Sequence, residues 1–185
     1  AGAVALGQGK MTEAKHFYGK ALELSPRTPE PRIGMARILR LEGKLDEAVK
    51  QLKTALDYES ESTEVAIELA DTYVFMNNWR AAVDLLTNLT EKNPKLFVLR
   101  GRLAGMQILS GQENIGYVTA KDLLQDNPQD IAAHLILADL FIRKGLTSVA
   151  IEHCQKAIAI NREVVRAHRL LALAYMTEAS WPKAI

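Results

Sequence analysis

The sequence predicts an all-α protein, built as a solenoid of antiparallel helix-turn-helix repeats. A turn-forming residue recurs every 34 residues, at Gly9, Gly43, Asn77, Gly111 and Gly145, and the same step then reaches Ala179. Small residues also recur at this interval before and after the turn. Small side chains at fixed helical positions allow two helix backbones to approach closely. A constant period without a slip therefore indicates stacked units rather than a globular domain.

The small residues define two helices in each repeat. Seven residues before the turn stand Gly2, Ala36, Ala70, Ala104, Ala138 and Ala172. Five residues after the turn stand Ala14, Ala48, Ala82, Gly116, Ala150 and Ala184. Apolar residues at helical spacing predict a first helix over residues 31–42 and a second over residues 46–58 in the clearest repeat.

Two further columns predict where the second helix begins and ends. The first column holds Thr12, Asp46, Arg80, Asn114, Ser148 and Pro182. Most of these residues are good N-caps, so we expect the second helix to begin there. The other column holds Pro26, Ser60, Pro94, Pro128 and Arg162. Proline there ends the helix and starts the next repeat.

This pattern resembles the tetratricopeptide repeat family. The resemblance rests on Leu-Ala or Leu-Gly in the first helix, the turn glycine and alanine in the second helix. It rests also on an aromatic residue one turn after the Leu-Ala pair, namely Tyr73, Phe141 or Tyr175, and on the ending shown by Tyr18, Ala21 and Pro26. It is weakened locally by Gly116, Gln107 and Arg162. The resemblance implies a right-handed superhelical solenoid.

We expect one continuous array without a linker. The predicted units are a partial repeat over residues 1–28, repeats over 29–62, 63–96, 97–130 and 131–164, and a partial repeat over 165–185. The chain opens inside a first helix and ends inside a second one, so we expect it to be a fragment of a longer chain. The repeat over 97–130 carries Gly101, Gly105, Gly111 and Gly116 and is the predicted weak point, with the fastest amide exchange.

Composition limits the partner and the compartment. The net charge is +1 with 24% charged residues, which argues against nucleic acid as the main ligand. The densest basic cluster, Arg162, Arg166, His168 and Arg169, is short and is interpreted as a solvated face. No apolar run reaches the roughly 18–20 residues that a membrane span needs. The single cysteine excludes an intramolecular disulfide and is compatible with the cytoplasm and with the bacterial periplasm or envelope.

No arrangement of residues predicts catalysis, a cofactor or a metal. Gly9-Lys10 lacks the other residues of a phosphate-binding loop. His153 and Cys154 are adjacent and so point about 100° apart on a helix, which argues against a catalytic pair. Cys154 shares a core column with Leu52 and Leu86, which predicts a buried, inert cysteine. We therefore expect a protein that is not an enzyme. Asn88 begins a glycosylation sequon inside a predicted helix, and Trp79 and Trp181 share a column that packs on the turn.

His134 and His168 are 34 residues apart and occupy equivalent places in adjacent repeats. One interpretation is a metal site between neighbouring first helices. The other is a half-buried edge that tolerates many residue types, since the same column holds Arg32, Ala66 and Arg100. Two ligands without a third are a poor metal site, which favours the second interpretation.

By the family resemblance, the first helices line an inner groove. The candidate groove residues are Arg37, Ile67, Asp71, Val74, Phe75, Arg102, Ile108, Leu135, Asp139, Ile142, Arg169, Leu173 and Met176. The set is mostly apolar and lacks the lysine, asparagine and arginine set with which chaperone-binding members grip a terminal carboxylate. We therefore expect a scaffold that holds an amphipathic helix or an apolar segment of a protein partner. The open alternative is that some of these side chains pack between neighbouring first helices.

A structural role is the second hypothesis. The array would then be a spacer or assembly platform, for example in bacterial envelope or exopolysaccharide secretion machinery, by analogy with the family. This hypothesis predicts self-association through apolar faces at the two uncapped ends, around residues 1–6 and 170–185.

Overall fold

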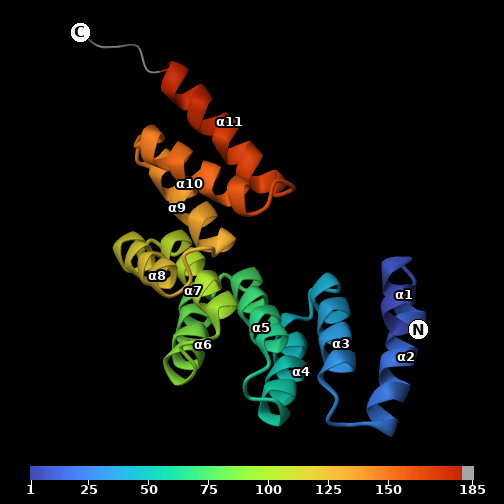
Figure 1. Ribbon diagram of the computed structural model, residues 1–185. Helices are drawn as coiled ribbons and strands as arrows, with labels where there is room; N and C mark the ends of the chain where they lie inside the picture. The colour runs from blue at the N-terminus through green and yellow to red at the C-terminus, as the bar shows by residue number, and fades with distance from the viewer. Residues whose placement is uncertain (181–185) are drawn as a thin grey trace. The chain divides into compact units, whose positions relative to one another are not determined.

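The computed structural model describes residues 1–180, and these residues form a succession of α-helices joined by short turns (Figure 1). The chain divides into two compact units, Ala1–Lys92 and Asn93–Ile185. The fold is all-helical, as predicted. First helices begin at Pro29, Thr63, Phe97, Ile131 and Val165, which are 34 residues apart.

Unit 1 contains three helix pairs. Its helices are α1 (Gly2–Gly7), α2 (Met11–Leu24), α3 (Pro29–Leu41), α4 (Leu45–Tyr58), α5 (Thr63–Phe75) and α6 (Trp79–Lys92). α3 packs against its own second helix α4 and also against the neighbouring first helices α1 and α5. The main core lies between α3, α4 and α5, where Ile33, Leu52 and Leu69 are buried.

Unit 2 repeats the same plan. Its helices are α7 (Phe97–Leu109), α8 (Glu113–Asp126), α9 (Ile131–Arg143), α10 (Thr147–Ile160) and α11 (Val165–Ser180). α9 packs against its second helix α10 and against the first helices α7 and α11. Its largest core cluster joins α9, α10 and α11 and includes Leu135, Cys154 and Leu170. Burial raises the pKa of the Cys154 thiol, consistent with the predicted inert cysteine.

The five predicted turn residues are confirmed. Gly9, Gly43, Asn77, Gly111 and Gly145 all have positive φ, between 57° and 89°. At the end of α3, the Lys44 N–H donates to the Leu39 carbonyl at 2.8 Å and the Gly43 N–H donates to the Arg40 carbonyl at 3.1 Å. This pair of bonds is a Schellman motif, which needs a left-handed residue at the turn. The sixth predicted turn is not formed at Ala179, because α11 continues through Ser180.

Small side chains occupy the helix crossings, as predicted. Ala14, Ala48, Ala82 and Ala150 are fully buried. Ala172, the last member of the first column, is exposed, and Ala184, the last member of the second, lies outside the described residues, as do Trp181 and Pro182. Gly116 takes the alanine position in α8, and a Cβ atom there would lie 2.5 Å from Ile108 Cγ1 and 2.7 Å from the Ala104 carbonyl oxygen. The α7 and α8 backbones therefore approach closely because residue 116 has no side chain.

The predicted N-cap column was wrong by two residues. Second helices begin directly after the Schellman turn, so the N-cap residues of α2, α4 and α8 are Lys10, Lys44 and Gln112. The residues predicted as caps, such as Asp46, lie inside the first turn of the helix. An acidic residue there still faces the positive end of the helix dipole.

The residues at the other helix boundaries behave as expected. Pro94 and Pro128 each follow the last helical residue by two positions. Trp79 is half-buried at the start of α6, and its indole Nε1–H donates to Asn77 Oδ1 at 3.0 Å. The tryptophan therefore links the turn to the second helix, as predicted.

Candidate functional site

The candidate groove residues of unit 1 lie on α3 and α5, and Arg37 is held there in ion pairs. Arg37 Nε donates to Glu68 Oε1 at 2.8 Å, and Arg37 Nη2 lies 3.3 Å from Glu64 Oε1. Arg40 Nη1 lies 3.2 Å from the other Glu68 oxygen, and the Arg40 guanidinium stands 5.0 Å from the centre of the Phe75 ring. The hydrogen bond to Glu68 raises the pKa of Arg37. This face is therefore a charged ladder rather than an apolar groove.

The remaining unit 1 candidates are less charged. Ile67, Asp71 and Val74 are half-buried along α5, whereas the Phe75 ring at the end of that helix is exposed. Their local order follows from helical spacing, since residues three and four apart share one face of α5.

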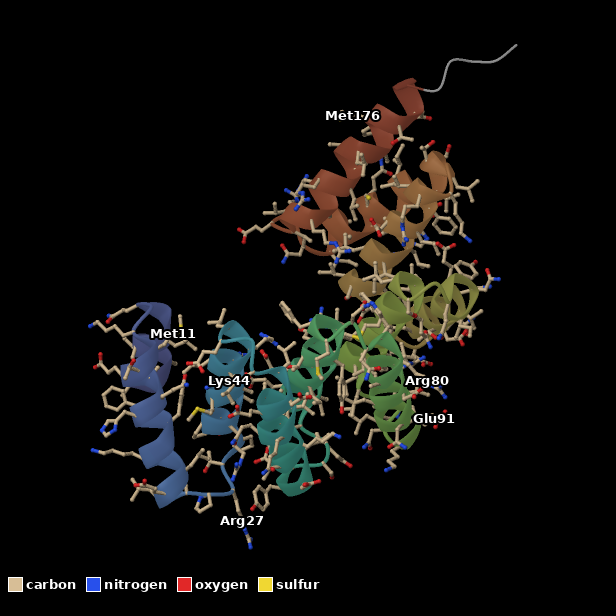
Figure 2. The ribbon with its side chains drawn as sticks, turned by 180° about the vertical axis from the view of Figure 1, so that it is seen from behind. Met11, Arg27, Lys44, Arg80, Glu91 and Met176 are labelled. Carbon is tan, nitrogen blue, oxygen red and sulfur yellow. The ribbon has the colours of Figure 1, made fainter. Side chains whose placement is uncertain are left out.

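In unit 2, four of the candidate residues meet at one hollow. A surface hollow of about 550 Å³ between α9 and α11 is lined by Asp139, Arg166, Arg169, Leu170, Ala172, Leu173 and Met176. Leu173 and Met176 are 45% and 69% exposed, which is high for large apolar side chains. Figure 2 shows Met176 toward the C-terminal end of α11. The hollow is thus both apolar and open.

The charges around the hollow are unequal. Arg143 Nη2 lies 3.4 Å from Asp139 Oδ2, so the one carboxylate of the hollow already faces a guanidinium. Arg166 and Arg169 are both exposed on α11, and no ion pair joins either of them to a carboxylate in the described part of the chain. The hollow therefore presents two uncompensated positive charges beside exposed apolar carbon.

Three predicted groove residues are corrected by their burial. Ile108, Leu135 and Ile142 are all buried and do not line an open surface. Leu135 and Ile142 stand two helical turns apart on α9 and belong to the core shared with α10 and α11. Ile108 packs on the bare backbone of Gly116. Arg102 is exposed on α7 and does not line the hollow.

Sequence reasoning missed part of this site. Arg166 and Leu170 line the hollow but were not among the candidate groove residues. The sequence places Arg166 in a short basic cluster, which predicts a solvated face rather than a binding site. The available signal was its spacing, since Arg166, Arg169 and Leu173 follow each other at three and four residues and so share one face of α11.

The histidines form a different pair from the one considered. His134 Nδ1 lies 2.9 Å from His153 Nδ1, while His168 is exposed and bonds the Arg162 carbonyl at 2.8 Å. The equivalent positions of His134 and His168 therefore do not bring the two rings together. Within residues 1–180, no group of three or more metal-ligating side chains is assembled.

The structure also bears on the membrane prediction. None of the helices in the described part of the chain combines the length and the apolar character that crossing a membrane requires.

Comparison with known families identifies the repeat. A sequence profile described as tetratricopeptide repeat matches residues 5–55 and 39–104, which together exceed half of the chain. The chain belongs to the tetratricopeptide repeat family. A search of curated proteins found no match to this tetratricopeptide repeat chain.

Solved structures agree with this fold. The chain is 19% identical to TTC0263, a thermophilic TPR protein of Thermus thermophilus, with 95% of each chain covered and a TM-score of 0.73. It is 19% identical to YrrB, a TPR protein with an unusual peptide-binding site, with 91% of this chain and 87% of that chain covered and a TM-score of 0.59. It is 18% identical to human IFIT1, solved as a dimer with m7Gppp-AAAA, with 92% of this chain and 42% of that chain covered and a TM-score of 0.69. At these identities the likeness concerns the fold alone.

Proposed function

We propose that this chain is a non-enzymatic scaffold that binds a segment of a protein partner on the first-helix face of unit 2. The observation that carries the proposal is the open hollow between α9 and α11. It combines the exposed side chains of Leu173 and Met176 with the guanidinium groups of Arg166 and Arg169.

The chemistry of the hollow defines the partner segment. An apolar side chain would cover Leu173 and Met176, and a neighbouring Asp or Glu would pair with an arginine. Burying the two apolar side chains contributes about 1–2 kcal/mol each. Each exposed guanidinium–carboxylate pair adds roughly 0.2–1 kcal/mol. This sum is at most about 6 kcal/mol before the cost of association, so these contacts alone correspond to a dissociation constant that is millimolar or weaker.

The comparisons support a protein partner by analogy. YrrB shares the fold and is described as having a peptide-binding site. Human IFIT1 shares it too and carries m7Gppp-AAAA. For this chain, a net charge of +1 and the apolar surface of Leu173 and Met176 favour a protein segment over nucleic acid.

The test is a capture experiment from a native lysate, read by mass spectrometry. The wild-type chain is compared with the hollow variant Arg169→Glu, Met176→Glu and with the control Val118→Glu, Lys121→Glu, which makes the same charge change on exposed positions of α8. Circular dichroism checks that both variants are folded. We expect the hollow variant alone to lose a specific protein partner. Equal recovery by all three proteins would contradict the proposal.

A second candidate is the assembly platform. Val4 on α1 and Tyr175 on α11 are exposed apolar side chains, as the predicted self-association requires. Light scattering between micromolar and millimolar chain concentrations tests it. A mass that rises with concentration, and falls back after Val4→Glu or Tyr175→Glu, would support assembly. A constant monomeric mass would contradict it.

A further inference from the structure

One column of the repeat ties four of the first helices to the loops that precede them. In four repeats, the side chain in this column bonds the backbone carbonyl six residues earlier. The pairs are Arg32 with Pro26 at 2.9 Å, Arg100 with Pro94 at 3.3 Å, His134 with Pro128 at 3.1 Å, and His168 with Arg162 at 2.8 Å. The column therefore satisfies a carbonyl left open where the second helix ends.

Three of these residues reach further, to the second helix of their own repeat: Arg100 pairs with Asp126 at the end of α8, and the other two bond to residues at equivalent repeat positions. In unit 1, Arg32 Nη1 donates to Gln51 Oε1 on α4 at 3.0 Å. In unit 2, His134 Nδ1 meets His153 Nδ1 on α10 at 2.9 Å. Both His residues stand three repeats after their unit 1 counterparts. The same joint is thus built once from an arginine and an amide, and once from two titratable imidazoles.

The hydrogen bonds determine where the protons of the histidine pair lie. The Pro128 carbonyl can only accept, so the Nε2 atom of His134 carries a hydrogen. In a neutral ring the Nδ1 atom of His134 is then a bare acceptor, and the His153 Nδ1–H donates to it. The pair fits when both rings are neutral. Two cationic rings would place a hydrogen on each Nδ1 atom, 2.9 Å apart, beside two like charges.

The surroundings of the pair resist added positive charge. His134 is only 4% exposed, and the Phe141 ring stacks on His153 with centroids 5.7 Å apart. Of the charged groups that act on the pair, Lys156 on α10 opposes protonation, while Asp130 before α9 and Glu152 on α10 favour it.

Both carboxylates are already engaged. Glu152 accepts from Lys156 Nζ at 2.6 Å, and Asp130 accepts from the Ala133 N–H at 2.9 Å. α8 adds the apolar side chain of Leu124 to the adjoining hollow. The carboxylates are therefore poorly placed to stabilise a second cationic ring.

We propose that the His134–His153 pair is a proton-sensitive joint. Acidification loosens α9 from α10 in unit 2, while the Arg32–Gln51 joint of unit 1 holds α3 on α4. The proposal stands independently of the binding function. One consequence does rest on that function: α9 carries Asp139, so acid would also disturb the proposed binding hollow.

The direction of the pH dependence follows from the pKa values. Desolvation lowers the pKa of His134, and desolvation together with the neighbouring His134 lowers the pKa of His153 to about 4. An unfolded histidine titrates near 6.5. The contribution of the neutral histidine pair to stability is therefore fully present above pH 6.5 and is lost as the pH falls from 6.5 toward 4. For His153 alone, the equilibrium constant for opening rises about 30-fold between pH 7.5 and pH 5.

The experiment measures amide-exchange protection factors at pH 7.5 and pH 5, corrected for intrinsic exchange. We expect protection in α9 and α10 to fall about 30-fold in the wild-type chain, while α3 and α4 lose less than about threefold as the internal control. The variant His134→Arg, His153→Gln installs the unit 1 pair and should remove the acid response of unit 2. Equal acid sensitivity in the two units, or in the variant and the wild type, would overturn the proposal.

A measurement on the wild-type chain covers the case in which the variant does not fold. NMR titration of the histidine ring protons should show His153 titrating near pH 4 and His134 titrating below the ordinary histidine value. Titration of both paired rings near pH 6.5 would overturn the proposal.

Discussion

The first-helix faces of unit 1 and unit 2 differ in how their charges are already used. On α3 and α5, Glu68 holds both Arg37 and Arg40. On α11, Arg166 and Arg169 stand beside exposed apolar carbon without such a carboxylate. Neighbouring first helices can therefore either neutralise the charges on their exposed face or leave those charges available to a partner. A groove residue predicted from repeat position alone does not distinguish these two outcomes.

The units also differ in how their helices approach one another. In unit 1, the ring of Tyr18 on α2 lies against the bare backbones of Gly2 and Gly34, where any added Cβ would overlap it. In unit 2, Gly116 itself brings α8 against α7. The missing side chain of glycine therefore makes room for a tyrosine ring in unit 1 and for the backbone of a neighbouring helix in unit 2. A helix backbone is harder to displace than a side chain.

Among the substitutions that test this comparison, we expect the largest change in the free energy of unfolding at Gly116. Gly116→Ala should lower the free energy of unfolding by about 2 kcal/mol, because the new Cβ would meet the Ala104 carbonyl and the Ile108 backbone. Chemical denaturation measures the change. The control is Gly19→Ala on α2, where an added Cβ meets no atom within 4 Å. A Gly116→Ala variant as stable as the control would contradict the close approach.

A smaller effect is expected from the charged ladder of unit 1. Glu68→Gln should cost about 1 kcal/mol, because it weakens contacts with Arg37 and Arg40 while the Glu68 side chain is only 13% exposed. The loss should shrink in 1 M salt, since screening weakens the ion pairs of the wild type. Denaturation at low and high salt measures it, with the exposed Glu91→Gln as control. A loss independent of salt would argue against an electrostatic ladder.

The smallest effect has the opposite sign. Gly105→Ala in α7 should raise the unfolding free energy by about 0.5–1 kcal/mol, because alanine favours the helix. The added Cβ would lie 3.6 Å from Ile136 Cδ1, an ordinary contact. Thermal unfolding measures the gain. Destabilisation by both substitutions would mean that Gly105 is crowded as well as Gly116.

The repeat period predicted much of the fold. Turn residues and helix crossings follow from local requirements, a left-handed backbone at Gly43 and a small side chain at Ala48, which a single sequence displays directly. The N-cap position was predicted wrongly because the prediction followed the residue types that favour N-caps rather than the length of the turn. Helix α4 begins at Leu45, with Lys44 as its N-cap, directly after the Schellman turn.

The site was less predictable, because it depends on contacts between repeats. Leu135 and Ile142 were placed in the groove by position, yet the core shared with α11 covers them. The ion pairs of Arg37 join it to Glu64 and Glu68 on α5, which are 27 and 31 residues away in sequence. The His134–His153 joint has a spacing of 19, which a search at the 34-residue interval does not detect. The faster amide exchange expected for residues 97–130 stays a prediction.

The central claim is that unit 2, rather than unit 1, offers the binding face. It is tested most directly by site-specific photocrosslinking in native lysate, with a photoreactive side chain at Leu173 in one protein and at Phe75 in another. Both positions are exposed on first helices. We predict crosslinks from position 173 to a segment that combines Asp or Glu with large apolar residues, and we expect high salt to weaken them. Crosslinks of equal yield from both positions, or from position 75 alone, would contradict it.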